Sequence, residues 1–424
     1  MSENNLSRAI GKLGIAALAI NGLIGAGIFA LPASAAALSG SWSPWAFIVC
    51  ALLMSLVILS FAQLSRGFDE TGGPVAYTQK AFGNHVAFQT TWLLYVGRLT
   101  ALAANTNALL LYISFFLPEI KEGLWHAISS LFVLTLLLLI NLRNVGQAMS
   151  VIQGITILKL LPLIAFILVG MSFWDNDIVF AFNSEDLGQF DVSLLLIVYA
   201  FIGFEGALVP AGESENPKKN IGYALITTLV VTAVMYFLIQ SISLSVLPDL
   251  SDSTTPLADA ATVMVGSVGA VIITIAAIVS IWGNLTTVVF TAPRMTYALA
   301  KEQNLPKWFG ELSETHHVPQ NAISFLVIVA AVLAVTGSFV WLAIISSLAR
   351  LIGYFISIAA LIKLRPEYVQ QNVWFLPFGI LVPCSALAVC LWLAFQASAS
   401  VWMFTLLFAG VGSAMFIVTK RKLD

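Results

Sequence analysis

The sequence predicts an all-α membrane protein with twelve transmembrane helices, ten of which form two inverted repeats of five. Three observations lead to this fold class. Of the 424 residues, 59% are hydrophobic and only 9% are charged, whereas soluble proteins carry roughly 25% charged residues. Apolar stretches that are long enough to cross a bilayer recur along the whole chain. The first and the sixth of these stretches also share a similar interruption.

The apolar stretches set the expected helices, since a transmembrane helix needs about 20 mostly apolar residues. They lie at residues 13–36, 43–65, 86–117, 123–141, 149–171, 192–210, 220–246, 263–293, 321–338, 340–362, 374–394 and 399–418. The third and eighth stretches are long, so they are expected to tilt or to protrude from the bilayer. The first stretch can cross by itself and is followed by eleven others. It is therefore expected to be a membrane helix rather than a cleaved signal peptide.

The lysines and arginines orient these helices. If the N-terminus is cytoplasmic, fifteen of the 19 lysines and arginines fall in cytoplasmic segments, and only Lys121 falls outside. Basic residues are enriched in cytoplasmic loops, so both termini are expected in the cytoplasm. The expected location is the inner (plasma) membrane.

The composition argues against several function classes. The net charge of −2 gives no reason to expect a nucleic acid partner. No phosphate-binding G-x-x-x-x-G-K-[ST] loop occurs, and the four histidines lack metal-ligand spacing. No nucleophile and base stand in a catalytic pattern. We therefore expect neither an enzyme nor an ATP-driven pump, and no metal or cofactor.

A short pattern recurs in the first and sixth stretches. Residues 21–33 read NGLIGAGIFALPA, and residues 200–211 read AFIGFEGALVPA. In both segments Ile-Gly is followed by Pro-Ala at the same spacing, and the two copies lie 178 residues apart. Matching glycine and proline interruptions in two halves of a membrane protein indicate an inverted-repeat transporter.

The recurrence divides the chain into segments. Residues 13–171 and 192–362 are the expected five-helix repeats, and residues 172–191 are the external loop between them. The remaining expected segments are a cytoplasmic loop at 363–373, two further helices within 374–418, and cytoplasmic tails at 1–12 and 419–424.

An interrupted helix offers backbone groups to a ligand. Backbone without helical hydrogen bonds is tolerated at membrane depth only where it lines a cavity or is buried in protein. The N-terminal end of a half-helix favours a carboxylate, and the C-terminal end favours an ammonium group. Two interrupted helices side by side therefore suit a zwitterionic amino acid, and glycine lets it approach the backbone. Close helix packing through Gly22 and Ala26 is the alternative interpretation.

Four ionisable residues lie deep in the predicted helices: Arg98, Lys159, Glu205 and Arg350. Such residues are costly in a bilayer and are functional candidates. A lysine shielded from water can exchange a proton near neutral pH. Lys159 could therefore couple transport to protons, standing where a sodium-coupled protein would hold its ion. The alternative is a permanently charged lysine that only stabilises freed carbonyl groups.

The other three ionisable residues allow more than one role. Glu205, which corresponds to Gly27 under the 178-residue offset, could handle protons or cap a half-helix. Arg98 could contact a substrate carboxylate or pair with Glu205, and Asn105 follows it on the same helix. Arg350 lies about as far into the tenth stretch as Lys159 lies into the fifth.

Two aromatic residues precede the second interruption. Tyr199 and Phe201 could close over a bound substrate, or they could simply pack in the core.

Four segments resemble signatures of the amino acid–polyamine–organocation family of transporters. GLIGAGIF at 22–29 resembles the family's first-helix signature, and the segment at 201–221 resembles its sixth-helix break with the following loop. LKLLPL at 158–163 approximates the family's IKxxPL pattern, and the segment at 292–322 resembles the loop after the eighth helix. The resemblance covers residues of about 10–370.

The resemblance implies a fold of the leucine-transporter type that works by alternating access. It implies that backbone at Ala26, Gly27 and Ile28 binds the substrate carboxylate. It also implies that carbonyl groups of Leu23, Tyr199 and Ile202 bind the amino group. By the same resemblance Tyr199 gates the site and Lys159 replaces a sodium ion. The candidate substrate-binding residues are Leu23, Ile24, Gly25, Ala26, Gly27, Ile28, Tyr199, Phe201, Ile202 and Gly203.

The sequence departs from the family pattern at two places. Ala26 stands where many relatives carry Ser or Thr, so it offers no hydroxyl group to a substrate. Arg98 lies outside the family motifs, and an arginine at this depth favours either an acidic substrate or fewer cationic ones. Arginine/agmatine exchangers have an acid at the Glu205 position, so this residue alone does not decide the coupling mode.

The resulting prediction is a secondary active transporter for proton-coupled uptake of small or neutral L-amino acids. An amino acid or amine exchanger is the alternative. A transporter-like sensor would carry an additional soluble domain, for which the predicted tails leave no room. The expected partners are an amino acid, a proton and the lipid bilayer, and the expected state is a monomer or a homodimer.

Overall fold

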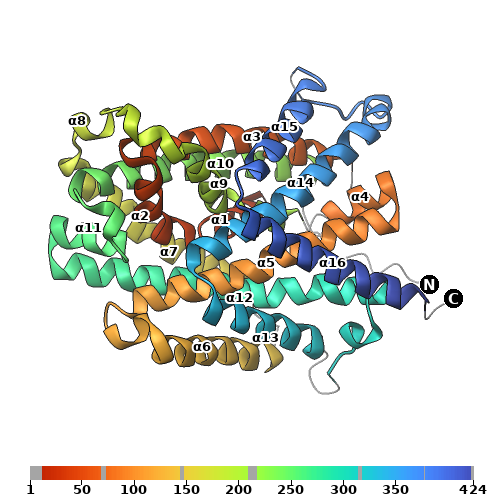
Figure 1. Ribbon diagram of the computed structural model, residues 1–424. Coiled ribbons are helices and arrows are strands. Elements are labelled where there is room, and N and C mark those ends of the chain that lie inside the picture. Colours follow the sequence, from red (N-terminus) through yellow and green to blue (C-terminus); the bar gives the residue numbers. More distant parts are fainter. Residues whose placement is uncertain are drawn as a thin grey trace.

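The computed structural model describes residues 12–67, 73–143, 148–208, 217–313, 318–376 and 378–421. Within these ranges all regular elements are α-helices or short 3-10 helices, and no strand occurs. The helices form one bundle (Figure 1). This all-helical content confirms the predicted all-α class.

The described residues contain seven helical segments that are long and apolar enough to cross a membrane. Several shorter apolar helices accompany them. The chain is therefore a multi-pass membrane protein, and the twelve spans stay a prediction. The seven segments are 27–66, 123–142, 184–207, 220–246, 267–301, 339–370 and 399–421.

The first half of the chain forms eight α-helices within the described ranges. They are α1 (Lys12–Leu23), α2 (Gly27–Ser39), α3 (Ser43–Arg66), α4 (Pro74–Phe82), α5 (Asn84–Ile113), α6 (Gly123–Arg143), α7 (Ala148–Gly170) and the short α8 (Asn176–Val179).

The second half begins with α9 (Phe190–Phe201) and the 3-10 turn η5 (Phe204–Ala207). The helices that follow are α10 (Pro217–Val246), α11 (Pro256–Val265), α12 (Ser267–Lys301), α13 (Gln320–Thr336), α14 (Phe339–Gln370), α15 (Leu381–Phe395) and α16 (Ala399–Arg421).

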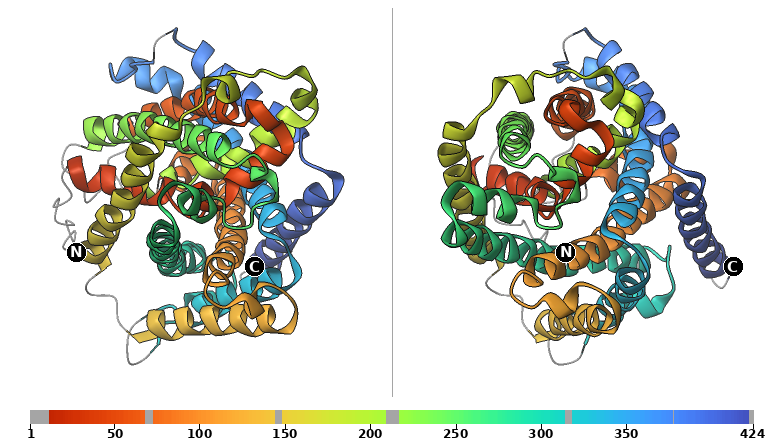
Figure 2. Two further views of the ribbon diagram at one scale, coloured as in Figure 1. Left: turned by 90° about the vertical axis from the view of Figure 1, so that its left-hand side faces the viewer. Right: turned by 60° about the vertical axis from the view of Figure 1, so that its left-hand side comes forward.

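Helix α5 lies at the centre of the packing. It contacts α14, α12 and α4, while α3 packs against α10 and α1 packs against α10 and η5. Helices α6 and α13 lie side by side at one edge of the bundle, and α16 lies at another (Figure 2). The buried core continues through most of these helices, so the residues on α5, α12 and α14 that face one another are shielded from the surroundings.

Several helix ends differ from the predicted stretches. The eighth stretch, expected from residue 263, is divided at Gly266, whose φ of +79° ends α11 before α12 begins. Helix α14 continues to Gln370, through most of the predicted loop at 363–373, and α15 starts at Leu381 rather than at 374. An apolar pattern marks the part of a helix in lipid, whereas backbone hydrogen bonding can continue beyond it. Here Leu364 and Tyr368 pack against Ala81 and support the longer α14.

Candidate functional site

The first predicted interruption lies between α1 and α2. Helix α1 ends at Leu23 and α2 begins at Gly27, so residues 24–26 belong to neither helix. Pro32 does not close this interruption, because α2 runs through it to Ser39. The carbonyl group of Pro32 accepts a hydrogen bond from the Gln240 amide at 3.1 Å. The break is therefore made by Ile24, Gly25 and Ala26, which the sequence had singled out.

The second interruption follows α9. This helix ends at Phe201, and Ile202 and Gly203 lead into η5. Gly203 has a φ of +105°, a left-handed conformation that favours glycine. The second copy of the Pro-Ala pair, at 210–211, lies outside the described residues.

The last turn of α1, just before the first interruption, is in backbone contact with the second interruption. A Cβ atom on Gly22 would lie 2.5 Å from the carbonyl oxygen of Gly203, and a Cβ atom on Gly203 would collide with the carbonyl oxygen of Gly22. Only glycine at both positions permits this approach. The structure thus places Gly22, next to the first interruption, directly against Gly203 in the second.

Lys159 on α7 contacts the first interruption. Its side chain is fully buried, and its ammonium group donates to the Asn21 side-chain oxygen and the Ile24 carbonyl oxygen, each at 2.6 Å. A longer contact of 3.3 Å reaches the Asn21 carbonyl oxygen. The three oxygen acceptors replace the water that the ammonium group loses on burial.

The Leu23 carbonyl group, expected to bind a substrate amino group, already accepts a hydrogen bond. The donor is the hydroxyl group of Tyr236 on α10, at 2.9 Å. A carbonyl oxygen has two lone pairs, so one remains for a ligand. Sequence reasoning did not find Tyr236, because one tyrosine in an apolar helix carries no signal of its partner.

A row of polar side chains links α9, α5 and α12 beside the first interruption. The Tyr199 hydroxyl group donates to the Asn105 side-chain oxygen at 2.5 Å. The Asn105 amide donates in turn to the Asn284 side-chain oxygen at 2.8 Å. The Asn284 amide lies against Gly25, where an added Cβ atom would meet its nitrogen at 3.0 Å. Asn284 was missed by sequence reasoning, although an asparagine within an apolar stretch is a usable signal.

The two predicted gate residues face different neighbours. The ring of Tyr199 packs edge-on against Phe339, the first residue of α14, with 5.8 Å between ring centroids. The ring of Phe201 packs against Tyr236 on the other side, at 5.5 Å. Tyr199 is therefore part of the row of polar side chains, whereas Phe201 packs against α10.

A buried charged cluster surrounds the second interruption. One carboxylate oxygen of Glu205 accepts hydrogen bonds from the Gly203 backbone amide at 2.9 Å and from the Tyr354 hydroxyl group at 2.7 Å. The other oxygen lies 3.2 Å from Nε of Arg350 and 4.0 Å from Nη2 of Arg98. The alternative in which Arg98 pairs with Glu205 is thus present, but Arg350 is the nearer partner. The sequence placed Arg350 only as a counterpart of Lys159.

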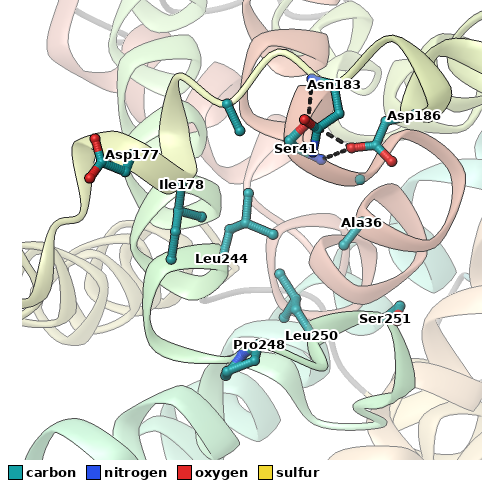
Figure 3. A pocket seen from close by; sticks show the side chains of 12 residues that line it. Ala36, Ser41, Asp177, Ile178, Asn183, Asp186, Leu244, Pro248, Leu250 and Ser251 are labelled. Atoms are coloured by element: carbon teal, nitrogen blue, oxygen red, sulfur yellow. Dashed lines mark hydrogen bonds between the residues drawn. The ribbon is translucent and has the colours of Figure 1, made fainter.

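A separate hollow lies near the C-terminal end of α2, away from the interruptions (Figure 3). Its volume is about 360 Å³, and its lining comes from α2, from the segment around α8 and from the end of α10. At its rim the carboxylate of Asp186 accepts hydrogen bonds from the Ser41 backbone amide at 2.9 Å and from the Ser41 hydroxyl group at 2.6 Å. These two bonds hold the pKa of Asp186 below its usual value. They join the 172–191 segment to the end of α2.

Comparison with known proteins agrees with the motifs. The chain is 24% identical to a methylthioribose transporter of Bacillus subtilis, over 99% of this chain and 95% of that protein. It is 28% identical to the serine/threonine exchanger SteT of the same organism, over 91% of this chain and 90% of that one. Its identity to an arginine/ornithine antiporter of Pseudomonas aeruginosa is 24%, over 96% and 90%. A family model described as amino acid permease matches residues 10–417. This protein therefore belongs to the amino acid permease family, within the amino acid–polyamine–organocation transporters that its motifs resemble.

Proposed function

We propose that this protein is a secondary active transporter that takes up small or neutral L-amino acids by alternating access and couples uptake to protons. The observation that carries the proposal is the contact of Gly22, next to the first interruption, with Gly203 in the second, with Lys159 bonded to the first. The proposed partners are the amino acid, the proton and the lipid bilayer, and the proposed state is a monomer or a homodimer.

The proposed architecture is the five-plus-five inverted repeat with two further helices. Helices α1 and α9 end at Leu23 and Phe201, which are 178 residues apart, the same offset as in the sequence pattern. Lys159 contacts the first interruption and Arg350 contacts the second, as repeat-related residues would. With this architecture we propose the two predicted five-helix repeats, location in the inner membrane, and both termini on the cytoplasmic side.

The proposed binding mode uses backbone groups at both interruptions. The first amide groups of α2, at Gly27 and Ile28, have no helical acceptor because the helix begins there. They suit the substrate carboxylate. Carbonyl groups at the end of α1 and around Ile202 suit the amino group. Tyr199, held by Asn105, is the proposed gate.

Binding is tested by thermal shift of the purified protein with each of the twenty amino acids and with polyamines. A ligand that binds only the folded protein raises its unfolding temperature. Selective stabilisation by a subset of amino acids is expected. If polyamines alone stabilise the protein, the proposed zwitterion site is wrong.

Proton coupling is assigned to Lys159. When protonated, its ammonium group holds Asn21 and Ile24 and so fixes the end of α1 against α7. Loss of the proton weakens this hold and lets α1 move. In proteoliposomes, Lys159→Gln is expected to bind substrate but to lose accumulation driven by an imposed pH gradient. If Lys159→Ala keeps full pH-driven accumulation, Lys159 is not the coupling residue.

Exchange is the alternative mode, because two of the similar proteins are named as an exchanger and an antiporter. The same proteoliposomes separate the two modes. Uptake that requires internal amino acid and ignores the pH gradient would favour exchange. Uptake into empty proteoliposomes that follows the pH gradient would favour proton coupling.

A further inference from the structure

In the part of the chain that the structure describes, the charged cluster at the second interruption holds more positive than negative charge. Among the described residues, Arg98 and Arg350 both face the same carboxylate, that of Glu205. All three side chains are buried, with 9%, 5% and 2% of their surface exposed. A buried charge without an opposite charge is costly. The cluster is therefore suited to an additional anion.

Of the two arginines, Arg98 lies farther from the one carboxylate that the described residues place in the cluster. Arg350 lies 3.2 Å from Glu205 and also donates to the Ser346 hydroxyl group at 2.9 Å. Arg98 lies 4.0 Å from the same carboxylate, and its Nη1 donates to the hydroxyl group of Thr291 at 2.9 Å. The buried Nε atoms of both arginines have no hydrogen-bond partner among the described residues, so the distance to Glu205 is what distinguishes Arg98 from Arg350.

The position of Arg98 places this charge beside the proposed amino acid site. Arg98 and Asn105 lie seven residues apart on α5, and their partners Thr291 and Asn284 lie seven apart on α12. Seven residues are nearly two helical turns, so the two bonded pairs lie on one face of each helix, about 10 Å apart. The Asn105–Asn284 pair adjoins the first interruption, and the Arg98–Thr291 pair adjoins the second.

Gly203 of the second interruption touches Gly22, which lies two residues before the first interruption. An amino acid whose charged ends bind at the interruptions can therefore extend its side chain along α5, towards Arg98. We propose that Arg98 determines which side-chain charge is accepted: it favours an anionic side chain over a neutral one of equal size and disfavours a cationic one. This inference rests on the proposed amino acid transport.

The test compares ligands that differ mainly in side-chain charge. Dissociation constants are measured by thermal shift for L-aspartate, L-asparagine and L-2,4-diaminobutyrate, and again for glutamate, glutamine and ornithine. In the wild-type protein, the acidic ligand of each set is expected to bind about tenfold or more tightly than the cationic one. The reason is that the guanidinium group of Arg98 attracts an anionic side chain and repels a cationic one.

Three variants separate the charge of Arg98 from its packing. Arg98→Gln is expected to remove most of the difference between the dissociation constants of the acidic and the cationic ligand. Arg98→Lys keeps the positive charge and is expected to keep the wild-type order of affinities. Glu205→Gln is expected to increase the preference for the acidic ligand. Its amide oxygen can still accept the hydrogen bonds of Gly203 and Tyr354.

The outcomes distinguish this inference from the proposed function. If amino acids bind but the wild-type protein prefers the cationic ligand, the inference is wrong and amino acid binding stands. The inference is also wrong, and amino acid binding still stands, if Arg98→Gln folds and keeps the wild-type ratio of the two dissociation constants. If Arg98→Gln does not fold, two results still test the inference: the order of ligand affinities in the wild-type protein, and the stronger preference for the acidic ligand expected in Glu205→Gln. If no amino acid in the panel binds, the proposed function itself fails.

Discussion

Replacing Gly203 by alanine tests the contact between Gly22 and the second interruption. The added Cβ atom would collide with the carbonyl oxygen of Gly22, and the residue would have to keep a φ of +105°. The left-handed conformation costs about 1–2 kcal/mol for a residue with a side chain. Overpacking typically costs about 1–3 kcal/mol more. The expected destabilisation is therefore roughly 2–5 kcal/mol.

Gly22→Ala separates the two contributions to this cost. Gly22 lies in α1, where alanine adopts the backbone without strain, so only the overpacking of about 1–3 kcal/mol remains. Gly410→Ala is the matched control, because a Cβ atom there would meet no atom within 4 Å. Alanine is also the better helix former at that position in α16.

The assay is thermal unfolding of the three purified variants, together with amino acid uptake in proteoliposomes. The expected order of stability is wild type and Gly410→Ala, then Gly22→Ala, then Gly203→Ala. Uptake is expected to be lost in both interruption variants. If Gly203→Ala is as stable and as active as Gly410→Ala, the interruptions do not depend on the contact between Gly22 and Gly203.

Three further predictions concern neighbouring contacts. Tyr236→Phe removes the hydroxyl group that bonds the Leu23 carbonyl; it should cost about 1 kcal/mol in unfolding free energy, and an unchanged unfolding temperature would argue against this bond. Pro32→Ala should retain uptake, because α2 continues through Pro32, and loss of uptake would assign this proline a role at the interruption. The Asp186 carboxylate should stabilise the join to Ser41 at neutral pH, and this stabilisation should disappear as the pH falls through the lowered pKa of Asp186. An Asp186→Asn variant should lack that pH dependence, which hydrogen exchange of the 172–191 segment can measure.

The sequence predicted those features that depend on residues close together in the chain. Gly25 and Gly203 mark the interruptions because glycine is a poor helix former and readily adopts non-helical backbone conformations. The family motif around Lys159 indicated that residue, and its contact with the first interruption follows from the packing of α7 against α1. The role of Pro32 was misplaced, because a proline can be accommodated within a membrane helix when neighbouring groups satisfy the freed carbonyl.

The remaining contacts depend on which helix faces meet. Glu205 and Arg350 are 145 residues apart, and Asn105 and Asn284 are 179 apart. The asparagine pair requires the packing of α5 against α12, and the ion pair requires that η5 meet α14; no local pattern specifies either contact. The helix ends at Gly266 and Gln370 also differ from the predicted stretches. Hydropathy shows which residues face lipid, but it does not show where the backbone hydrogen bonding of a helix begins or ends.

The claim at the centre of this account is that both charged ends of an amino acid bind at the two interruptions. The most direct measurement compares the amino acid that binds best with its methyl ester and with its decarboxylated amine, on the wild-type protein. Each analogue lacks the carboxylate, and N-acetylation of the same amino acid removes the ammonium group. The account predicts that each of these changes weakens binding at least about tenfold. Equal binding of the amine and the amino acid would contradict it.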